Sequence, residues 1–502
     1  MIVEVENLGS IKKGKVELKP LTVFIGPNNT GKTYLAYLIS GLCEDFLFRK
    51  YIFSPVRGKR KPVYTLSERV VSDILEKGYA EIKINLKDIL AENFEYTASI
   101  FRKLSERPIL VQKFVESFWK FLGGDKKEMF SNLKATVKIP NIDSRNEFEE
   151  IVYNRSGHII THMFYEENIM LRAISFKKPK SYQMDVRLRL IERKIFSEDK
   201  QEINDAISKQ IDQFLSRIIL FLLMKIILQP ILSNVFIFPA QRNALTLDFI
   251  KSAINIATRE EIPDEDLIVS NPERLIKSKP ILKFLRMVDL ISEDIESEYY
   301  DIGQRLEEVL GGHLIISESK GEEEIRFIIN GEKSLKLITT SSMVQQLSSL
   351  ALYLKHQAKS GDLMVIDEPE SNLHPEAQTR ITEVIAEMVN GGLWVIITTH
   401  SPFILEHINN LMKAYVVASM SEETRELVLD VIRNENALLN PEKVGVYLFT
   451  KEGIIEDIKR DYIIDAESFR KVSDELGAKF TELLLIEDLY KKLIGESDDS
   501  SV

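Results

Sequence analysis

The chain has 502 residues, of which 44% are hydrophobic and 28% charged, and its net charge is −11 at pH 7. This length favours two or three lobes over one compact domain, and the acidic balance argues against a surface that coats nucleic acid indiscriminately, because such binding depends on neutralising phosphates. Cys43 is the single cysteine, which excludes an internal disulfide and zinc sites built from paired cysteines, and favours a reducing, cytoplasmic setting.

The N-terminal residues have the pattern of a small α/β unit. Residues 2–5 and 15–18 alternate apolar with charged side chains around a glycine-containing turn, which predicts two short strands. The continuous apolar run 21–25 predicts a buried strand. A glycine-rich turn follows, and a helix is expected over 32–42. We expect no secretory signal at this end, because it lacks an apolar core.

Residues 45–230 predict a large, mainly helical insertion, because helical patterns there alternate with only a few strand-like runs such as 184–194. The most apolar stretch, 214–232, contains Arg217 and Lys225. We expect it to be a buried helix and not a membrane span, since a central Arg or Lys costs about 2.5–3.5 kcal/mol on insertion scales.

After the insertion, the pattern predicts a parallel sheet with crossover helices, because strands and helices alternate. The expected elements are a strand at 234–238, helices over 247–310, an antiparallel meander over 313–338 with an Asn330-Gly331 turn, a helix at 343–357, a strand at 363–366, a helix at 375–389, a strand at 393–398 and a strand pair near 444–449 with two further helices. The predicted units are therefore 1–44 and 231–412 as two parts of one head, 45–230 as the insertion, and 413–502 as a C-terminal extension of the head.

A complete phosphate-binding motif follows the predicted strand 21–25. Residues 26–33 read GPNNTGKT and fit G-x-x-x-x-G-K-[ST] in every position, at the start of a predicted helix. The glycines allow backbone N–H groups to point into one cradle, and the helix N-terminus adds partial positive charge. Lys32 is expected to reach the β- and γ-phosphates of ATP, and Thr33 to bind Mg²⁺. The expected nucleotide contacts are Gly26, Pro27, Asn28, Asn29, Thr30, Gly31, Lys32, Thr33 and Tyr34.

Two acidic residues, Asp367 and Glu368, follow the predicted strand 363–366. If that strand lies beside the strand before the P-loop, Asp367 reaches the Mg²⁺ shell. Glu368 is then the natural general base for an attacking water. Two acids after a strand can also simply begin a loop, but beside a complete P-loop they indicate the second half of an ATP site.

His400 follows the next predicted strand, in Thr-Thr-His-Ser-Pro. A lone histidine is usually structural. This strand, however, is expected beside the strand of Asp367, where His400 would face the same phosphate edge. We therefore predict a sensor of the γ-phosphate.

Together, GPNNTGKT at 26–33, IDEPESNLHPEAQ at 366–378 and TTHSP at 398–402 resemble the ABC-type ATPases of the SMC/RecF superclass. The set is most similar to the prokaryotic AAA_15/AAA_21 and OLD (overcoming lysogenization defect) groups, in which E-P-E-x-x-L-H-P is the form of the Walker B and D-loop segment. Pro-Ala-Gln-Arg at 239–242 resembles their P-A-x-R element. The resemblance implies an α/β P-loop fold of ABC-ATPase type, with a mixed central sheet and an antiparallel β-subdomain.

The resemblance also implies a dimer whose two ATP sites are completed head-to-tail. Asn372, in the D-loop, would touch the nucleotide of the other subunit. The signature segment, which binds the γ-phosphate across the dimer, would fall at 340–343. Ser341 matches the serine of its S-x-G pattern, but Met343 stands where glycine is expected, and a side chain there hinders close backbone approach to a phosphate. Gln241 is the candidate Q-loop glutamine at Mg²⁺, or else a structural residue at a strand end.

Two weaker patterns lie in the insertion. Its basic clusters fit a DNA or RNA path, a solvated loop or the footprint of an acidic partner; they are Arg49, Lys50, Arg57, Lys59, Arg60 and Lys61, and Lys177, Lys178, Lys180, Arg187, Arg189, Arg193 and Lys194. His158, His162 and Glu166 could line one helix face as metal ligands. GHIITHMFY is more typical of a strand, however, since it is β-branched and aromatic.

OLD nucleases carry a TOPRIM domain with a metal-binding D-x-D pair after the ATPase, and no D-x-D follows His400 here. We therefore expect an ATP-driven switch without its own nuclease. It would act as a sensor or scaffold for a separate protein effector, as in antiviral defence systems with ATPases that resemble this one. The alternative is a DNA-repair or DNA-structure ATPase that grips nucleic acid through the basic insertion.

Overall fold

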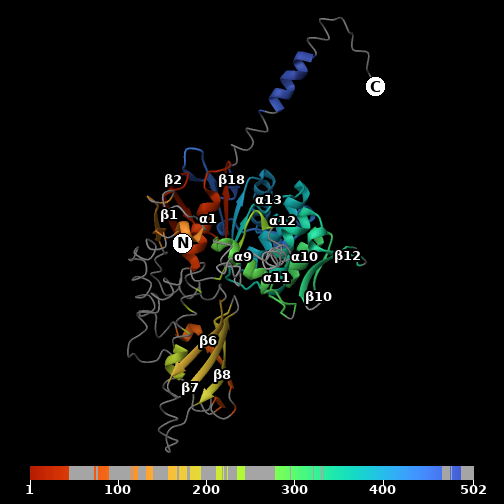
Figure 1. Ribbon diagram of the computed structural model, residues 1–502. Coiled ribbons are helices and arrows are strands. Elements are labelled where there is room, and N and C mark those ends of the chain that lie inside the picture. Colours follow the sequence, from red (N-terminus) through yellow and green to blue (C-terminus); the bar gives the residue numbers. More distant parts are fainter. Residues whose placement is uncertain are drawn as a thin grey trace, which may run out of the picture.

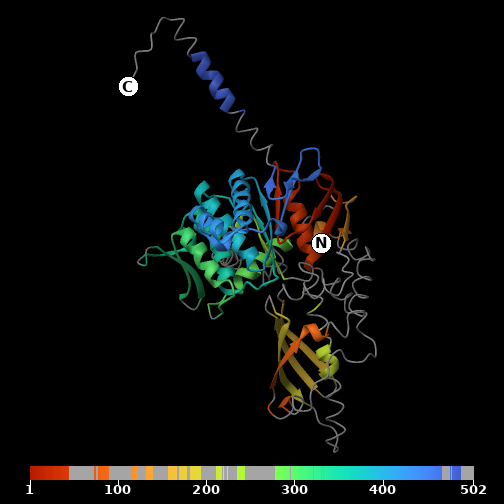
Figure 2. The same cartoon turned by 180° about the vertical axis from the view of Figure 1, so that it is seen from behind.

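The computed structural model describes residues 1–44, 79–89, 157–166, 169–177, 181–193, 234–242, 278–293, 295–319, 322–329, 333–465 and 477–487, and shorter runs or single residues at 73–74, 77, 115–116, 118–122, 130, 132–138, 211–216, 219, 223, 226, 331 and 475. Figure 1 shows a head that contains both the N-terminal residues and residues 278–465, a separate sheet from the insertion, and a C-terminal helix that projects from the head. The same three parts are visible from behind in Figure 2.

A six-stranded sheet forms the centre of the head, in the order β16-β15-β3-β14-β13-β9. All neighbouring strands are parallel except β15 and β16. Every residue of β3, β13 and β14 is buried, which explains why their sequences are continuous apolar runs and not alternating ones. The strands are β3 (Leu21–Ile25), β9 (Val235–Phe238), β13 (Leu363–Asp367), β14 (Trp394–Thr399), β15 (Val444–Phe449) and β16 (Ile455–Asp457).

Helices cover both faces of this sheet, because alternate strand residues point to opposite sides. On one face, Leu35 and Ile39 of the helix after β3 share a core with Val365. On the other face, Ile366 and Ile397 belong to a second core, built with five helices. The helix on the first face is α1 (Lys32–Glu44), and those on the second are α9 (Lys279–Asp289), α10 (Tyr300–Leu310), α11 (Ser342–His356), α12 (Pro375–Asn390) and α13 (Pro402–Ala418).

Three of these helices begin at residues that cap them. The side chains of Ser341, His374 and Ser401 accept hydrogen bonds from backbone N–H groups in the first turns of α11, α12 and α13. Proline follows the cap in α12 and α13, where its missing N–H costs nothing. The starts of these helices are therefore well defined, and each lies in a segment that the sequence marks as functional.

Two antiparallel sheets flank the central one, and both match predicted strands. β1 (Ile2–Leu8) and β2 (Ile11–Glu17) form the predicted N-terminal hairpin, which β5 (Lys134–Lys138) of the insertion extends on the β1 side. β10 (Gly312–Ser319), β11 (Glu322–Ile329) and β12 (Lys333–Lys336) form the predicted meander. Gly331 in its second turn has φ +71°, a conformation that favours glycine.

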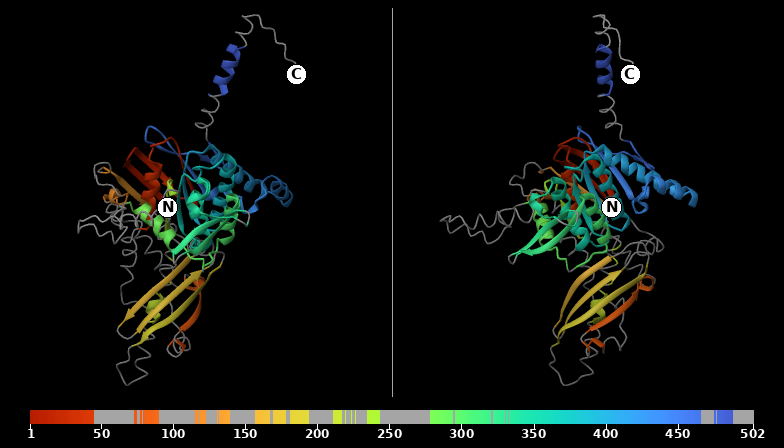
Figure 3. Two further views of the ribbon diagram at one scale, coloured as in Figure 1. Left: turned by 45° about the vertical axis from the view of Figure 1, so that its right-hand side comes forward. Right: turned by 90° about the vertical axis from the view of Figure 1, so that its right-hand side faces the viewer.

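The insertion contains a four-stranded antiparallel sheet that the prediction of a mainly helical segment lacked. Its order is β4-β8-β7-β6, from β4 (Tyr79–Asn85), β6 (Gly157–Glu166), β7 (Ile169–Lys177) and β8 (Gln183–Arg193). Figure 3 shows this sheet set apart from the head in both views. In β8, Met184, Val186 and Leu188 are buried while Arg187 and Arg189 are exposed, as the alternation predicts. Tertiary pairing of distant segments, which has no local signal, explains the missed sheet.

GHIITHMFY is a strand, so the metal site on a helix face is excluded. The 214–232 stretch is helical and buried where the structure describes it, at Leu215, Ile219 and Leu223. No helix among the described residues is long and apolar enough to cross a membrane.

Residues 419–465, which follow α13, lie in the head. The sheet strand β15 falls here, so the predicted boundary at 412 lies within α13 and not between units. The remaining described elements in this region are α14 (Glu422–Val431), the short strands β17 (Lys459–Arg460) and β18 (Ile463–Ile464), and 3₁₀ turns at Glu435–Ala437 and Pro441–Lys443; a third 3₁₀ turn, Leu337–Thr339, precedes α11.

Replacing Lys355 with methionine should destabilise the head by about 3–5 kcal/mol. The Lys355 Nζ lies 2.8 Å from Glu307 Oε1, and the two side chains are 8% and 1% exposed. The variant leaves a buried carboxylate without its cation. The double variant Lys355→Met/Glu307→Gln should recover most of the loss, since the Gln oxygen can still accept from the Leu314 N–H. Urea unfolding of the three proteins measures both effects; equal losses in single and double variants would contradict them.

Candidate functional site

The expected site residues meet at one edge of the central sheet, where its parallel strands end. The P-loop follows β3, Thr399 ends β14 with His400 directly after it, and Asp367 ends β13. The strand of Asp367 is not next to the P-loop strand, because β14 lies between them. β14 does border β13, as expected. Ligands of open α/β sheets bind at this kind of edge, beyond the carboxyl ends of the strands.

The P-loop contains two glycines that no other residue could replace without strain. Gly26 has φ +145°, and a Cβ there would lie 2.3 Å from the backbone oxygen of Phe449. Gly31 has φ +93°, and its Cβ would lie 2.8 Å from Ile11. Asn29 also has a positive φ, of 63°, which Asn tolerates better than most residues. Between the two glycines, the loop is exposed at Pro27 and Asn28.

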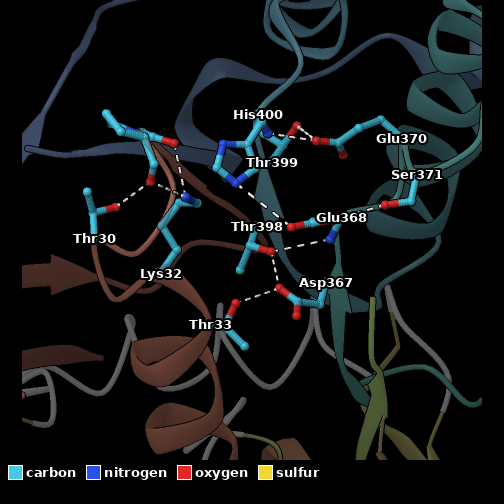
Figure 4. A network of polar contacts seen from close by, with 12 residues as sticks. Thr30, Lys32, Thr33, Asp367, Glu368, Glu370, Ser371, Thr398, Thr399 and His400 are labelled. Carbon is cyan, nitrogen blue, oxygen red and sulfur yellow. Dashed lines mark hydrogen bonds and ion pairs between the residues drawn. The ribbon is translucent and has the colours of Figure 1, made fainter. Parts of the chain in front are cut away.

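Lys32 is held inside this loop. Its Nζ donates to the backbone oxygens of Gly26 at 2.9 Å and Pro27 at 2.8 Å, and the residue is 5% exposed. Figure 4 shows the side chain folded back under the loop, beside Thr30, whose hydroxyl also donates to Pro27 O. Burial lowers the pKa of Lys32 to about 8, although Glu368 and Asp367 act in the opposite direction. A phosphate entering the cradle can replace the two carbonyl oxygens as acceptor.

ATP affinity should fall as the pH rises above about 8. Phosphates bind the charged amine, so affinity is insensitive to Lys32 below its pKa and falls by up to about tenfold per pH unit above it. Lys32→Arg is the control, because guanidinium keeps its charge throughout this range. Titration with a fluorescent ATP analogue between pH 7 and 9.5 should show the fall for the parent and a flatter profile for the Arg variant. The same pH dependence of affinity in both proteins would contradict the assignment of Lys32 as the titrating phosphate ligand.

Thr33 and Asp367, 334 positions apart in sequence, are in direct contact. Thr33 Oγ1 donates to Asp367 Oδ1 at 2.9 Å. The Thr398 hydroxyl, from β14, donates to the same carboxylate oxygen. Burial raises the pKa of Asp367, while the hydrogen bonds from Thr398 and Thr33 oppose the rise. The arrangement presents hydroxyl and carboxylate oxygens, the ligand type that Mg²⁺ prefers, beside the cradle.

Glu368 and His400 face each other across the site (Figure 4). His400 Nε2 lies 3.8 Å from Glu368 Oε1, and the Ser371 hydroxyl donates to Glu368 Oε2 at 3.1 Å. Burial, and then the positive charge of Lys32, lowers the pKa of His400, which favours the neutral imidazole. Glu368 has φ +48°, an unfavourable conformation for a residue of this type. Such backbone strain is concentrated at functional sites.

Arg242 of the Pro-Ala-Gln-Arg segment is almost fully buried, at 2% exposed, behind Asp367. Its guanidinium donates to the backbone oxygens of Asp367 at 2.9 Å, Gln346 at 2.8 Å and Pro239 at 3.1 Å. Burial lowers the pKa of Arg242 to about 10, and Asp367 opposes the shift. Arg242 thus joins the end of β13 to α11. Gln241, the candidate metal ligand, is exposed at the same edge.

Three expected site residues lie elsewhere or face away. Ser341 caps α11, and its side chain accepts from Val344 N–H of the same helix. Asn372 is exposed, with φ +63°. The ring of Tyr34 packs edge-on against Phe130, with centroids 5.6 Å apart, so it contributes to the core beneath α1. Within the described residues, none of the three has a recorded hydrogen bond or ion pair with Lys32, Asp367 or Glu368.

Sequence reasoning missed one hydroxyl group and one carboxyl group at the site. Thr398 contacts Asp367, and Glu370 accepts from the Thr399 hydroxyl and the His400 N–H. Glu370 belongs to the E-P-E motif, but no local sequence pattern shows that its side chain turns back toward β14. Of the basic clusters, Arg187 forms an ion pair with Glu81; the cluster at 49–61 lies outside the described residues.

A P-loop at the end of a central strand, an acidic pair and a histidine at the ends of the neighbouring strands, and flanking antiparallel sheets define a P-loop NTPase of ABC-ATPase type. The chain belongs to the AAA_15 family, an AAA ATPase domain, which matches residues 1–405. It is therefore an ATPase, in agreement with its resemblance to SMC/RecF-like and OLD-like proteins.

A curated relative is the Old nuclease of Escherichia phage P2, 24% identical over 176 residues, which are 32% of this chain and 29% of that protein. The match thus spans less than a third of the nuclease. Solved structures with some likeness include an SmcHead bound to the C-winged helix domain of ScpA, with 12% identity and a TM-score of 0.33 over 92% of this chain and 97% of that one. Another is the SMC head domain from Thermotoga maritima, with 10% identity and a TM-score of 0.25 over 81% and 90%. At these TM-scores the similarities provide no further evidence for the fold.

Proposed function

We propose that the protein is a cytoplasmic, ATP-driven switch in which two copies close head-to-tail around two molecules of Mg-ATP and hydrolysis opens them again. The observation that supports this most is the convergence of Lys32, Thr33, Asp367, Glu368 and His400 at one sheet edge. The binding energy gained at the phosphates would shift the equilibrium toward the closed dimer.

The phosphate and metal roles follow from the geometry of the P-loop. The Lys32 amine would move from Gly26 O and Pro27 O to the β- and γ-phosphates, while the loop N–H groups hold the remaining oxygens. Thr33 and Asp367 would hold Mg²⁺, with Gln241 as a further ligand from the neighbouring strand end. When bound, Mg²⁺ neutralises charge that develops on the phosphates.

Glu368 is the proposed general base and His400 the proposed γ-phosphate sensor. The Glu368 carboxylate can accept a proton from a water aligned with the γ-phosphate, since Ser371 orients it and the lowered pKa of the neighbouring His400 favours a neutral ring. A neutral His400 ring, 3.8 Å away, can hydrogen-bond the phosphate or the water.

Ser341 and Asn372 are proposed to complete the site of the second copy. The start of α11 is exposed at Ser341 and Ser342, so its first N–H groups can meet an anion from outside. The Met343 side chain is partly buried and packs against the core beneath α11, away from that exposed surface. The departure from S-x-G therefore leaves the two serines accessible. We expect a working but slow ATPase.

A complementation experiment tests the composite sites. Lys32→Ala should remove nucleotide binding, and Ser341→Arg should block the site of the partner; each variant alone should lack activity. Mixed, they form heterodimers in which the Lys32 of one copy meets the Ser341 of the other in one intact site. Up to about a quarter of parental turnover should return, since random pairing makes half of the dimers mixed and each has one of two sites. No recovery on mixing would end the head-to-tail proposal.

We propose that the switch serves a separate protein effector in a prokaryotic defence-type system. The helix at 477–487 projects from the head (Figure 1) and exposes Phe480 at 65%, Leu483 at 63% and Leu484 at 45%, which share one helix face. Exposed apolar patches of this kind mark protein interaction sites. Leu483→Glu should abolish co-purification with a protein encoded by a neighbouring gene and leave ATP turnover intact, whereas Thr481→Glu should retain both. Retention by Leu483→Glu would contradict this role of the helix.

The alternative is an ATPase of DNA repair or DNA structure. The exposed Arg187 and Arg189 on the insertion sheet are the described basic residues that favour it, although Arg187 is paired with Glu81. Salt-dependent DNA binding that is lost when residues 57–61 are neutralised would support this alternative over the effector role. Absence of binding at about 50 mM salt would exclude the alternative.

A further inference from the structure

The peptide that contains His400 is held by a partly buried carboxyl group that is not part of the ATP-binding set. Glu370 Oε1 accepts from the Thr399 hydroxyl at 2.8 Å and from the His400 backbone N–H at 2.6 Å. In Figure 4 the Glu370 carboxyl group meets the backbone of this peptide, whereas Glu368 meets the ring of His400. Thr399 is fully buried, so water cannot replace these contacts easily.

Burying this carboxyl group is costly. Burial raises the pKa of Glu370, while the hydrogen bonds from the His400 backbone and Thr399 oppose the rise. Its second oxygen, Oε2, is buried and has no hydrogen-bond partner among the described residues. An unpartnered buried carboxyl oxygen in a native site calls for a functional reason. The contacts of Oε1 supply one, because they fix the peptide that carries the histidine.

The same peptide is held from its other end by Gln378 of α12. The Ser401 hydroxyl donates to Gln378 Oε1 at 2.5 Å and also caps α13. Gln378 Nε2 in turn donates to the backbone oxygen of Leu373, beside Asn372. Residues 399–401 are thus tied at two points to the chain that follows β13: to Glu370 in the loop and to Gln378 in α12.

We propose that Glu370 is a positioning residue for His400: it fixes the backbone of this histidine so that the ring faces Glu368 and the γ-phosphate, and Gln378 connects the same peptide to the loop of Asn372. This inference rests on the roles proposed above for His400 and Asn372. It assigns to the second glutamate of Glu368-Pro369-Glu370 a role that differs from that of the first. Movement of the Asn372 loop by a second copy would then change the position of His400.

Glu370→Ala should lower kcat by about 10–100-fold and leave the KM for ATP nearly unchanged, because a misplacement of the order of 1 Å at a catalytic group costs this much and the phosphate cradle is untouched. Glu370→Gln should restore most of the rate, since its amide oxygen can accept from the His400 N–H. A purely structural role would not separate kcat from KM in this way. Loss of ATP affinity equal to the loss of rate would overturn the proposal.

The combination with His400→Ala decides whether Glu370 acts through the histidine. If it does, the double variant Glu370→Ala/His400→Ala should be no slower than His400→Ala alone, because the two changes remove one function. Multiplied losses would overturn the inference. A parental rate for His400→Ala would instead overturn the proposed sensor, so that the two failures are distinguishable.

Gln378→Leu provides a second measurement in case Glu370→Ala does not fold. It removes the hydrogen bond between Ser401 and Gln378, and it should also lower kcat with little change in KM. Gln357→Leu is the matched control: its side chain also donates to a backbone oxygen, that of Met287 at 2.9 Å, but at the end of α11 and not at its start. A Gln378→Leu variant with unchanged kcat would overturn the connection to the Asn372 loop.

Discussion

Lys32→Ala should reduce ATP affinity by about 10²–10⁴-fold, which amounts to abolished binding at ordinary concentrations. The lysine would make two charge-assisted hydrogen bonds to phosphate, each worth about 1.5–3 kcal/mol. The amine is already in place in the cradle, 2.8–2.9 Å from two loop carbonyls, so little ordering of this side chain opposes binding. Isothermal titration with Mg-ATP measures the loss.

The stability of the variant separates loss of a ligand contact from loss of the fold. Lys32→Ala leaves space below the exposed tip of the loop, through which water can replace the amine at the loop oxygens. We therefore expect an unfolding midpoint close to that of the parent without nucleotide, and no stabilisation by ATP. Lys333→Ala, at an exposed position of β12, should retain full affinity. Unaltered ATP binding by Lys32→Ala would remove the basis for every role proposed at this site.

The predictable parts of this molecule are those in which local pattern and chemistry coincide. The run 21–25, the glycines at 26 and 31 and the helix that follows are consecutive in sequence, and each requirement of a P-loop is visible there. The acidic pair and His400 were also predicted, because apolar strands end directly before them.

Strand order was not predictable in the same way. A sequence shows that β13 and β14 exist, but not that β14 inserts between β3 and β13, since this depends on which edges the crossover helices leave open. The sheet of the insertion was missed for a related reason. Its strands pair segments as distant as 79–85 and 183–193, and local helical patterns in between outnumbered the strand signals.

Buried polar contacts form the other unpredicted class. Arg242 and Glu370 are polar residues in loops, where sequence reasoning expects exposure. Arg242 is buried and Glu370 partly buried, and each satisfies backbone groups of segments more than 25 positions away in sequence: Arg242 those of Asp367 and Gln346, and Glu370 that of His400. Such contacts appear only once distant chain segments have been placed.

Glu368→Gln should lower kcat by about 10²–10⁴-fold while ATP binding persists, because the amide cannot accept the proton of the attacking water. The change keeps the shape of the side chain, and glutamine at φ +48° has the same backbone strain as glutamate, so stability should not change. Loss of a negative charge near Lys32 should if anything favour triphosphate binding. With hydrolysis blocked, Mg-ATP should hold the protein as a dimer, which sedimentation velocity can detect.

The matched control is Glu376→Gln, on the exposed first turn of α12, which lies in the same segment but pairs only with Arg380 among the described residues. It should turn over ATP at the parental rate and return to monomer as ATP is consumed. If Glu368→Gln hydrolyses as fast as this control, the base is another residue. Suppose instead that Glu368→Gln stops turnover yet stays monomeric in saturating Mg-ATP. The assignment of the base is then correct and the head-to-tail dimer is wrong. The trapped ATP state would lack the contacts that Ser341 and Asn372 are proposed to make.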